Sequence, residues 1–187
     1  MSKKTAGVAC IVLAAWAVGC GYSTHSTLDQ RYQTIAVPAF KNLSREYDLQ
    51  APLTNAVIRK FITDSRLQVT SLDKADLILE GVILDYRRKG LTYDRDDEVT
   101  QFLGFVTAGA RLTDAATGET LWEDDQMVGE TTFYTRAAGQ SSDRLRGNAE
   151  FFLPTVRSFA SEEENRGVAE ALEQLATDIF LRTIEPW

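Results

Sequence analysis

The chain has 187 residues, and its 20 Lys and Arg against 27 Asp and Glu give a formal net charge of −7 at pH 7. A negative field of this size repels nucleic acid and anionic surfaces at long range, so nucleic-acid binding is excluded as a main function and an anionic ligand needs a local basic cluster. Two cysteines and a single histidine also leave few groups for a thiol-based or histidine-based active site.

The amino-terminal segment has the organisation of a secretory signal peptide. Lys3 and Lys4 form a charged start, residues 6–18 form an apolar run, and small residues precede Cys20. The apolar run is shorter than the roughly 20 residues that a membrane-spanning helix needs. We therefore predict that residues 1–19 are a signal peptide and that residues 20–33 form a tether to the membrane.

Residues 17–20 (AVGC) resemble the bacterial lipobox, in which a small residue before cysteine permits cleavage. This resemblance implies that Cys20 carries covalent diacylglycerol and an N-acyl lipid, which would anchor the chain. Gly21 after the cysteine implies sorting to the outer membrane. The alternative is an ordinary secretory signal with an incidental cysteine. Since Cys10 would leave with the signal, we expect the mature protein to keep no free thiol and to need no other cofactor.

The first half of the domain is predicted to contain a strand, a helix and a short strand. Residues 34–40 are rich in β-branched residues, but Pro38 limits them to an edge strand or a strand end. Asp48 is a candidate N-cap for a helix that reaches about residue 64, because apolar residues recur there with helical spacing. Residues 67–71 read as the short strand.

The middle of the chain is predicted to be an antiparallel meander. Residues 75–88 are apolar on both alternating sets, which is typical of an interior strand. A charged loop at residues 89–98 leads to a strand over residues 99–113. A turn at residues 114–118 then ends in glycine, and residues 119–134 return as a strand.

The carboxyl-terminal part is predicted to end in a long helix that packs on the sheet. Ser161 and Glu164 match a capping box, and an apolar stripe follows as far as about residue 183. Residues 136–160 are an excursion whose structure the sequence leaves open. We predict one α+β domain over residues 34–187, a two-layer sandwich with a mixed, mainly antiparallel sheet of four or five strands and two helices on one face.

No group of residues matches a common catalytic motif. His25 lies in the tether, and the sequence contains no zinc-protease helix, glycine-rich phosphate loop or CxxC pair. The acidic groups at residues 94–98 and 123–125 could supply oxygen ligands, but the first group lacks the spacing of a calcium loop, and no metal site is predicted. A glycoside-hydrolase site made of two carboxylates stays an open alternative, because the distance between two carboxylates depends on the fold. The sequence therefore favours a protein that is not an enzyme.

One basic cluster lies at the end of the most apolar strand. Arg87, Arg88 and Lys89 are flanked by Tyr86 and Tyr93. Guanidinium groups match phosphate geometry, and a neighbouring aromatic ring can cover an acyl chain or a sugar. We predict these five residues as a candidate lipopolysaccharide-binding site. The alternative is a solvated strand end whose basic residues pair with the carboxylates of the following loop.

Several segments, in their order and spacing, resemble the lipopolysaccharide-assembly lipoprotein family LptE. The resemblance covers residues 20–134 and 161–187, including the terminal helix and the closing Trp187. Its main segments are residues 20–23 (CGYS), 35–42 (IAVPAFKN), 75–81 (ADLILEG) and 112–122 (LTDAATGETLW).

The resemblance implies a non-catalytic lipoprotein on the periplasmic side of the outer membrane. Its partners would be lipopolysaccharide and the LptD β-barrel, whose lumen it would plug while lipopolysaccharide is inserted at the cell surface. Family members are thought to bind lipopolysaccharide through basic residues at one end of the sheet, and the basic cluster is the nearest candidate by position. The alternative is a lipoprotein that assembles a secretion channel or activates a cell-wall synthase, since those proteins share the opening of residues 35–42.

Overall fold

A computed structural model describes residues 28–29, 31–135 and 149–185. The predicted signal peptide, the lipidation site Cys20, and His25 therefore lie outside the described residues, as do residues 136–148 and the closing Trp187. Among the described helices, none is long and apolar enough to span a membrane.

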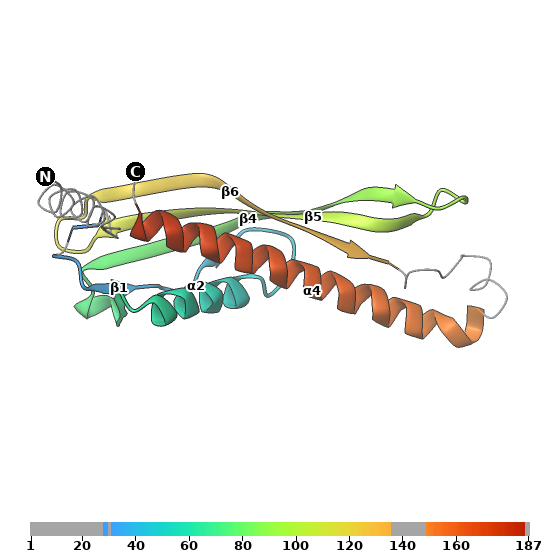
Figure 1. The fold of residues 1–187 in the computed structure, drawn as a ribbon, viewed down its shortest axis with the longest axis horizontal. Coiled ribbons are helices and arrows are strands. Elements are labelled where there is room, and N and C mark those ends of the chain that lie inside the picture. Colours follow the sequence, from blue (N-terminus) through green and yellow to red (C-terminus); the bar gives the residue numbers. More distant parts are fainter. Residues whose placement is uncertain (1–27, 30, 136–148, 186–187) are drawn as a thin grey trace, which may run out of the picture.

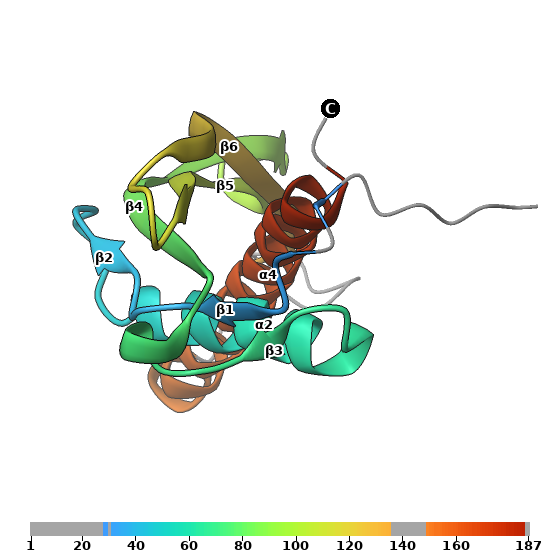
Figure 2. The ribbon, with the colours of Figure 1, turned by 90° about the vertical axis from the view of Figure 1, so that its left-hand side faces the viewer.

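The fold is an open mixed sheet with two helices packed against it (Figures 1 and 2). The strand order in the sheet is β3-β1-β4-β5-β6. Strand β2 lies off this path and pairs with β4. Strand β1 pairs in parallel with β3 and with β4, and β2 also pairs in parallel with β4. Strands β4, β5 and β6 form the predicted antiparallel meander. The predicted α+β class is confirmed. The elements are β1 (Thr34–Ala36), β2 (Lys41–Asn42), α2 (Gln50–Asp64), β3 (Gln68–Val69), the 3-10 helix η2 (Leu72–Lys74), β4 (Leu77–Tyr93), β5 (Val99–Asp114), β6 (Thr120–Tyr134) and α4 (Ala149–Ile184).

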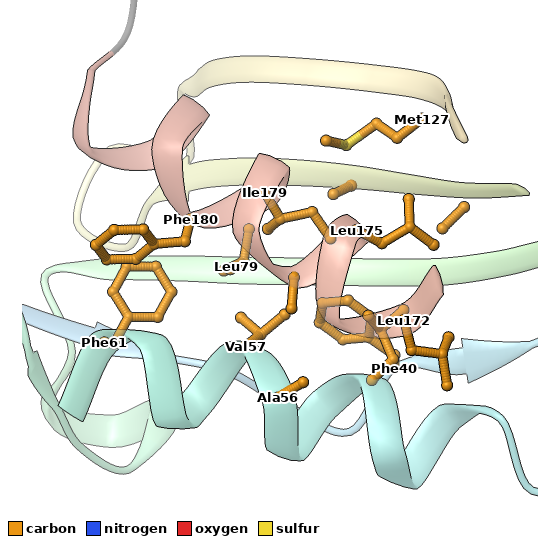
Figure 3. Packing of buried hydrophobic residues seen from close by; sticks show 14 of the residues in the cluster. Phe40, Ala56, Val57, Phe61, Leu79, Met127, Leu172, Leu175, Ile179 and Phe180 are labelled. Carbon is orange, nitrogen blue, oxygen red and sulfur yellow. The ribbon is translucent and has the colours of Figure 1, made fainter. Parts of the chain in front are cut away.

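The core lies between the sheet and the two helices (Figure 3). Phe61 of α2 meets Phe180 of α4 edge to face, with ring centroids 5.2 Å apart. Leu79 of β4 and Ile179 of α4 are fully buried beside them. Helix α4 passes close to the sheet at Gly129 of β6, where an added Cβ would lie 2.3 Å from the Ala171 carbonyl oxygen. Only a residue without a side chain allows this approach.

Both predicted helix starts are wrong. Leu49, not Asp48, is the residue before α2, and it makes no side-chain cap, while Asp48 has a positive φ of 60°. The long helix begins at Ala149, so Ser161 lies inside it and is not its N-cap. Part of the open segment at residues 136–160 is therefore helical. A capping-box pattern inside a helix carries no capping role, because the backbone N–H groups there already bond to the preceding turn.

The strand predictions are largely confirmed, with two changes of extent. Strand β1 ends at Ala36, before Pro38, which fits a strand end, but it lies between β3 and β4 and is not an edge strand. Strand β4 continues to Tyr93, so the predicted loop at residues 89–98 shrinks to residues 94–98. The strand continues because β5 pairs with it over this whole length. The turn at residues 114–118 is confirmed, with Gly118 at φ 72°.

Candidate functional site

The predicted basic cluster lies on the β4–β5 hairpin, in the part of β4 that extends beyond β1 and β2. Strands β1 and β2 pair with β4 only as far as Ile83, and residues 84–93 pair with β5 alone. Figure 1 shows this hairpin leading away from α2 toward one end of the molecule. Its turn is closed by the Asp94 carboxylate, which accepts hydrogen bonds from the N–H groups of Asp96 at 2.9 Å and Glu98 at 3.0 Å.

A β-bulge at Leu84 decides which side chains of the hairpin face the helices. Ile83 is opposite Ala108 and Asp85 is opposite Thr107, so Leu84 is an extra residue in β4. Side chains alternate between the two faces of a strand, and one extra residue reverses the alternation beyond it. As far as Gly90, the even-numbered residues after the bulge therefore face α4, and the odd-numbered ones face the opposite side of the sheet, here called the open face. A second register shift, between Gly90 and Thr92, reverses the alternation again.

Tyr86 and Arg88 face α4 and share one carboxylate. The Tyr86 hydroxyl donates to Glu164 Oε1 at 2.8 Å, and Arg88 Nη1 contacts both Glu164 oxygens at 3.0 and 2.9 Å. The Arg88 guanidinium also lies 5.7 Å from the centre of the Phe102 ring. Burial, and then the bond to Glu164, raise the pKa of the Tyr86 hydroxyl. Glu164 thus holds the hairpin to the helix, and two of the predicted ligand-binding residues already have a structural partner.

Arg87 and Lys89 lie on the open face beside apolar side chains of β5. Arg87 is directly opposite Phe105, and Lys89 is directly opposite Leu103. Both apolar side chains are only partly buried. Arg87 pairs with Asp85 at 2.9 Å, with the arginine side chain 72% exposed. This surface, the open-face strip of these four residues, combines positive charge with exposed hydrocarbon.

Tyr93 lies on the helix side of the hairpin. Its hydroxyl would be 2.6 Å from a Cβ added at Gly90, which alternates with Tyr86 and Arg88, and the residue is 58% exposed. Of the five predicted residues, Tyr86, Arg88 and Tyr93 therefore lie on the helix side of the hairpin. Arg87 and Lys89 lie on the open face. Arg88 and Arg87 take Glu164 and Asp85 as ion-pair partners, in place of the loop carboxylates that the alternative prediction named.

Sequence reasoning missed two parts of this region. The capping-box pattern predicts that Glu164 caps its own helix. In the structure Glu164 instead contacts Arg88, which is 76 residues away in the sequence, and no local pattern predicts such a contact. The side chains of Leu103 and Phe105 could have been found, because they are the odd-numbered members of an alternating strand whose even-numbered members form the core.

At the other end of the sheet, two carboxylates hold the segment where the described chain begins. Asp76 Oδ2 accepts bonds from the Gln33 N–H at 3.0 Å, the Thr34 N–H at 2.9 Å and the Thr34 hydroxyl at 2.7 Å. Asp114, 4% exposed, accepts the Tyr32 hydroxyl at 2.8 Å. We call these contacts the amino-terminal clip.

The clip lowers the pKa of both carboxyl groups. For Asp76 the largest cause is the backbone N–H of Gln33, and for Asp114 it is the backbone N–H of Thr117. Hydrogen bonds to a charged carboxylate favour the ionised form. For Tyr32, burial and the bond to Asp114 raise the hydroxyl pKa. These groups are arranged to hold a backbone segment in place.

The acidic groups that were weighed as calcium ligands have structural partners. Glu123 pairs with Arg111, and Asp124 pairs with Arg182 of α4. Within residues 28–29, 31–135 and 149–185, no cluster of three or more metal-ligating side chains is present. A cavity of about 260 Å³ lies over the open face between Lys41, Glu80 and Arg111, and its charged lining contains both signs.

Comparison with known proteins gives one family and several distant folds. The model of the lipopolysaccharide-assembly family LptE matches residues 32–183. No curated protein matches the sequence.

Among solved structures, a minor lipoprotein from Acinetobacter baumannii aligns with TM-score 0.47 and 12% identity, over 82% of this chain and 93% of that one. Lipoprotein GNA1162 from Neisseria meningitidis aligns with TM-score 0.40 and 14% identity, over 67% and 99%. PelC from Paraburkholderia phytofirmans aligns with TM-score 0.40 and 16% identity, over 78% and 90%.

Proposed function

Because the chain belongs to the lipopolysaccharide-assembly family LptE, we propose that it is a non-catalytic outer-membrane lipoprotein that occupies the lumen of the LptD β-barrel and assists lipopolysaccharide insertion. The family match, which spans nearly all of the described residues, carries this proposal. In this proposal the lipid on Cys20 anchors the chain on the periplasmic side of the membrane, and the folded domain makes the contacts with the barrel.

The test is what remains bound to the lipidated chain after extraction in mild detergent. The chain would carry an affinity tag after residue 187 and be expressed in its own host. We expect a large β-barrel of the LptD type in stoichiometric amount. A soluble cell-wall synthase or a ring of this chain alone, without a barrel, would contradict the proposal and favour the alternative lipoprotein functions.

A Cys20→Ser variant is the matched control for anchoring. Lipidation cannot occur on serine, whereas the folded domain begins beyond the tether and should be unaffected. We expect an unchanged circular dichroism spectrum together with loss from the membrane fraction. An unchanged membrane fraction would show that Cys20 does not carry the anchor.

The open-face strip is the better candidate for contact with lipopolysaccharide. Arg87 and Lys89 supply positive charge for phosphate, and Leu103 and Phe105 lie directly opposite them for acyl chains. Arg88 and Tyr86 are less available, because Glu164 already takes their polar groups. Of the originally predicted five residues, the proposal therefore keeps Arg87 and Lys89 as ligand contacts and assigns Tyr86, Arg88 and Tyr93 to the helix side.

Charge reversal at two matched pairs of positions tests this assignment. Arg87→Glu with Lys89→Glu should weaken binding of purified lipopolysaccharide, measured by fluorescence titration, by about tenfold or more, because two favourable phosphate contacts become repulsive. The control is Arg45→Glu with Lys74→Glu, two exposed basic residues outside the hairpin, which makes the same change of charge elsewhere. If both pairs have equal effects, binding depends on net charge and not on the strip.

A further inference from the structure

The cavity of about 260 Å³ over the open face lies in the middle of the sheet, apart from the hairpin. Strands β4, β5 and β6 form its floor. The register places two rows of residues across these strands, with Glu80, Arg111 and Glu123 in one row and Val82 and Gly109 in the next. The floor therefore has no side chain at Gly109, which belongs to the middle strand of the three.

Neither backbone conformation nor packing requires glycine at position 109. Its φ lies outside the left-handed region, and an added Cβ would lie 3.4 Å from its three nearest atoms, which is ordinary contact. A register shift lies opposite Gly109, but the extra residue belongs to β6. Glycine inside a strand lowers stability and often marks the close approach of another molecule. What the missing side chain provides here is the space of the cavity.

Two side chains of opposite charge at this cavity have no partner in the part of the chain that the structure describes. Lys41 lies on β2 and Asp125 lies on β6, and neither side chain makes an ion pair or a hydrogen bond there. Arg111 and Glu123, in contrast, hold each other, with Arg111 Nε 2.8 Å from Glu123 Oε1. Three strand spacings separate the backbones of Lys41 and Asp125 by about 14 Å, which leaves room for a small molecule between the two charges.

This arrangement selects a zwitterion. An anion alone would be attracted by Lys41 but repelled by Glu80 and Asp125, and a cation alone would be repelled by Lys41. A molecule with an anionic group at one end and an ammonium at the other places each end beside the opposite charge. Lysine binds phosphate as a point charge, so phosphate suits the Lys41 side.

We propose that the cavity is a binding site for a small zwitterion of the aminoalkyl phosphate type, with its phosphate at Lys41, its ammonium at Asp125 and its carbon chain over Gly109. Free phosphoethanolamine and the head group of phosphatidylethanolamine share this chemistry. Because the two charged side chains are exposed, each contact contributes little, and we expect a dissociation constant in the millimolar range. The inference goes beyond the proposed function and does not depend on it.

Nuclear magnetic resonance of the lipidated full-length chain, labelled with 15N-glycine in a non-ionic detergent, tests the site. The amide signals of Gly81 and Gly109 report the cavity. Those of Gly118, in the turn after β5, and Gly167, in α4, are internal controls. The ligands are phosphoethanolamine, phosphate, ethanolamine, and micelles that contain either phosphatidylethanolamine or phosphatidylglycerol.

We expect phosphoethanolamine to shift the Gly81 and Gly109 signals in a saturable way and to leave the Gly118 and Gly167 signals in place. Phosphate or ethanolamine alone should bind about threefold more weakly or less, because each engages only one of the two charges. Micelles with phosphatidylethanolamine should shift the same two signals, and micelles with phosphatidylglycerol, which lacks the ammonium, should not.

Three variants identify the contacts. Lys41→Gln and Asp125→Asn should each raise the dissociation constant about threefold or more. Gly109→Val should abolish the shift of the Gly81 signal, because the new side chain fills the cavity, and its circular dichroism spectrum shows whether the domain folds. The matched control is Asp73→Asn with Lys74→Gln, two exposed charges of η2, which should bind like wild type.

The proposal is overturned if neither phosphoethanolamine nor phosphatidylethanolamine shifts the Gly81 and Gly109 signals, or if the control signals shift equally. It is also overturned if phosphate alone or phosphatidylglycerol binds as well as the zwitterion, or if the control variant weakens binding as much as Lys41→Gln. Shifts with the lipid but not with the free compound support the site and identify a membrane head group as its ligand. Shifts with both support the site for either source.

Discussion

The two ends of strand β4 lie in opposite environments. Leu77 and Leu79, near its start, are fully buried between the sheet and the helices, whereas Leu91 and Tyr93, at its end, are about half exposed. The start of the strand is paired on both sides, and its end is paired on one side only. One strand thus belongs to the buried core at one end and to an exposed hairpin at the other.

The same contrast appears in how polar groups are used. At the scaffold end, Asp76 accepts the backbone N–H of Thr34 and Asp114 accepts the Tyr32 hydroxyl, so two carboxylates hold a segment that is far away in the sequence. At the hairpin end, the polar side chains are exposed, and Glu164 is the link from β4 to α4. Regions with few buried contacts open locally at low free energy, so the hairpin should be the more dynamic end.

The largest expected effect comes from truncating leucines at the two ends of β4. Leu77→Ala should lower the free energy of unfolding by about 2–5 kcal/mol, because it leaves a cavity in a fully buried position. Leu91→Ala should change it by less than about 0.5 kcal/mol, since the side chain is half exposed. Urea unfolding followed by circular dichroism measures both. Equal losses would mean that the hairpin is as much a part of the core as the start of the strand.

A second prediction concerns the pH dependence of the clip. The pKa of Asp76 and of Asp114 is lowered in the folded state, so their stabilising contribution is complete above the ordinary carboxyl pKa near 4. It is lost as the pH falls from about 4 toward the folded-state values, because the unfolded chain then binds protons first. The double variant Asp76→Asn and Asp114→Asn should therefore lose less stability than wild type between pH 6 and pH 3.

Urea midpoints at the two pH values measure this difference. The control is Asp73→Asn, at an exposed aspartate of η2, which should keep the wild-type pH dependence. If the double variant loses as much stability on acidification as wild type, the clip does not contribute to acid sensitivity.

A smaller effect is expected at the link between hairpin and helix. Glu164→Ala removes the acceptor shared by Tyr86 and Arg88 and should cost about 1 kcal/mol, the ordinary net value of such bonds at a partly exposed position. Amide hydrogen exchange should become faster at residues 86–90, with little change at residues 77–80. Uniform acceleration along β4 would mean that the two ends do not open separately.

The smallest effect is expected on the open face. Arg87→Gln breaks the pair with Asp85, but both side chains are largely exposed, so the free energy of unfolding should change by less than about 0.5 kcal/mol. The same variant should weaken lipopolysaccharide binding in the fluorescence titration. A large loss of stability without a loss of binding would reverse the roles assigned to Arg87 and Arg88.

Local patterns predicted the strands well because alternation and turn residues act over a few positions. The meander, the turn before Gly118 and the interior character of residues 77–83 all followed from such patterns. The helix starts did not, because Ser161 and Glu164 match a capping box that the longer helix overrides. Tertiary packing decides whether a local signal is used.

The candidate site was predicted only in part for a related reason. The run of three basic residues was visible in the sequence, but its division between two faces depends on the strand alternation and on one bulge. Neither Leu84 nor its neighbours carry a residue type that marks a bulge. The position of Glu164 beside Tyr86 likewise depends on how α4 crosses the sheet.

The extra residue at position 84 determines which side chains of the hairpin face α4. Because strand side chains repeat every two residues, regular pairing of Leu84 opposite Thr107 would move each following residue of β4 by one position and exchange their faces. Arg87 and Lys89 would then point at α4, and Arg88 would join the solvent side, with no change in composition. Deletion of Leu84 would instead remove the bulge and leave Asp85 opposite Thr107, so Arg87 and Lys89 would keep their present face.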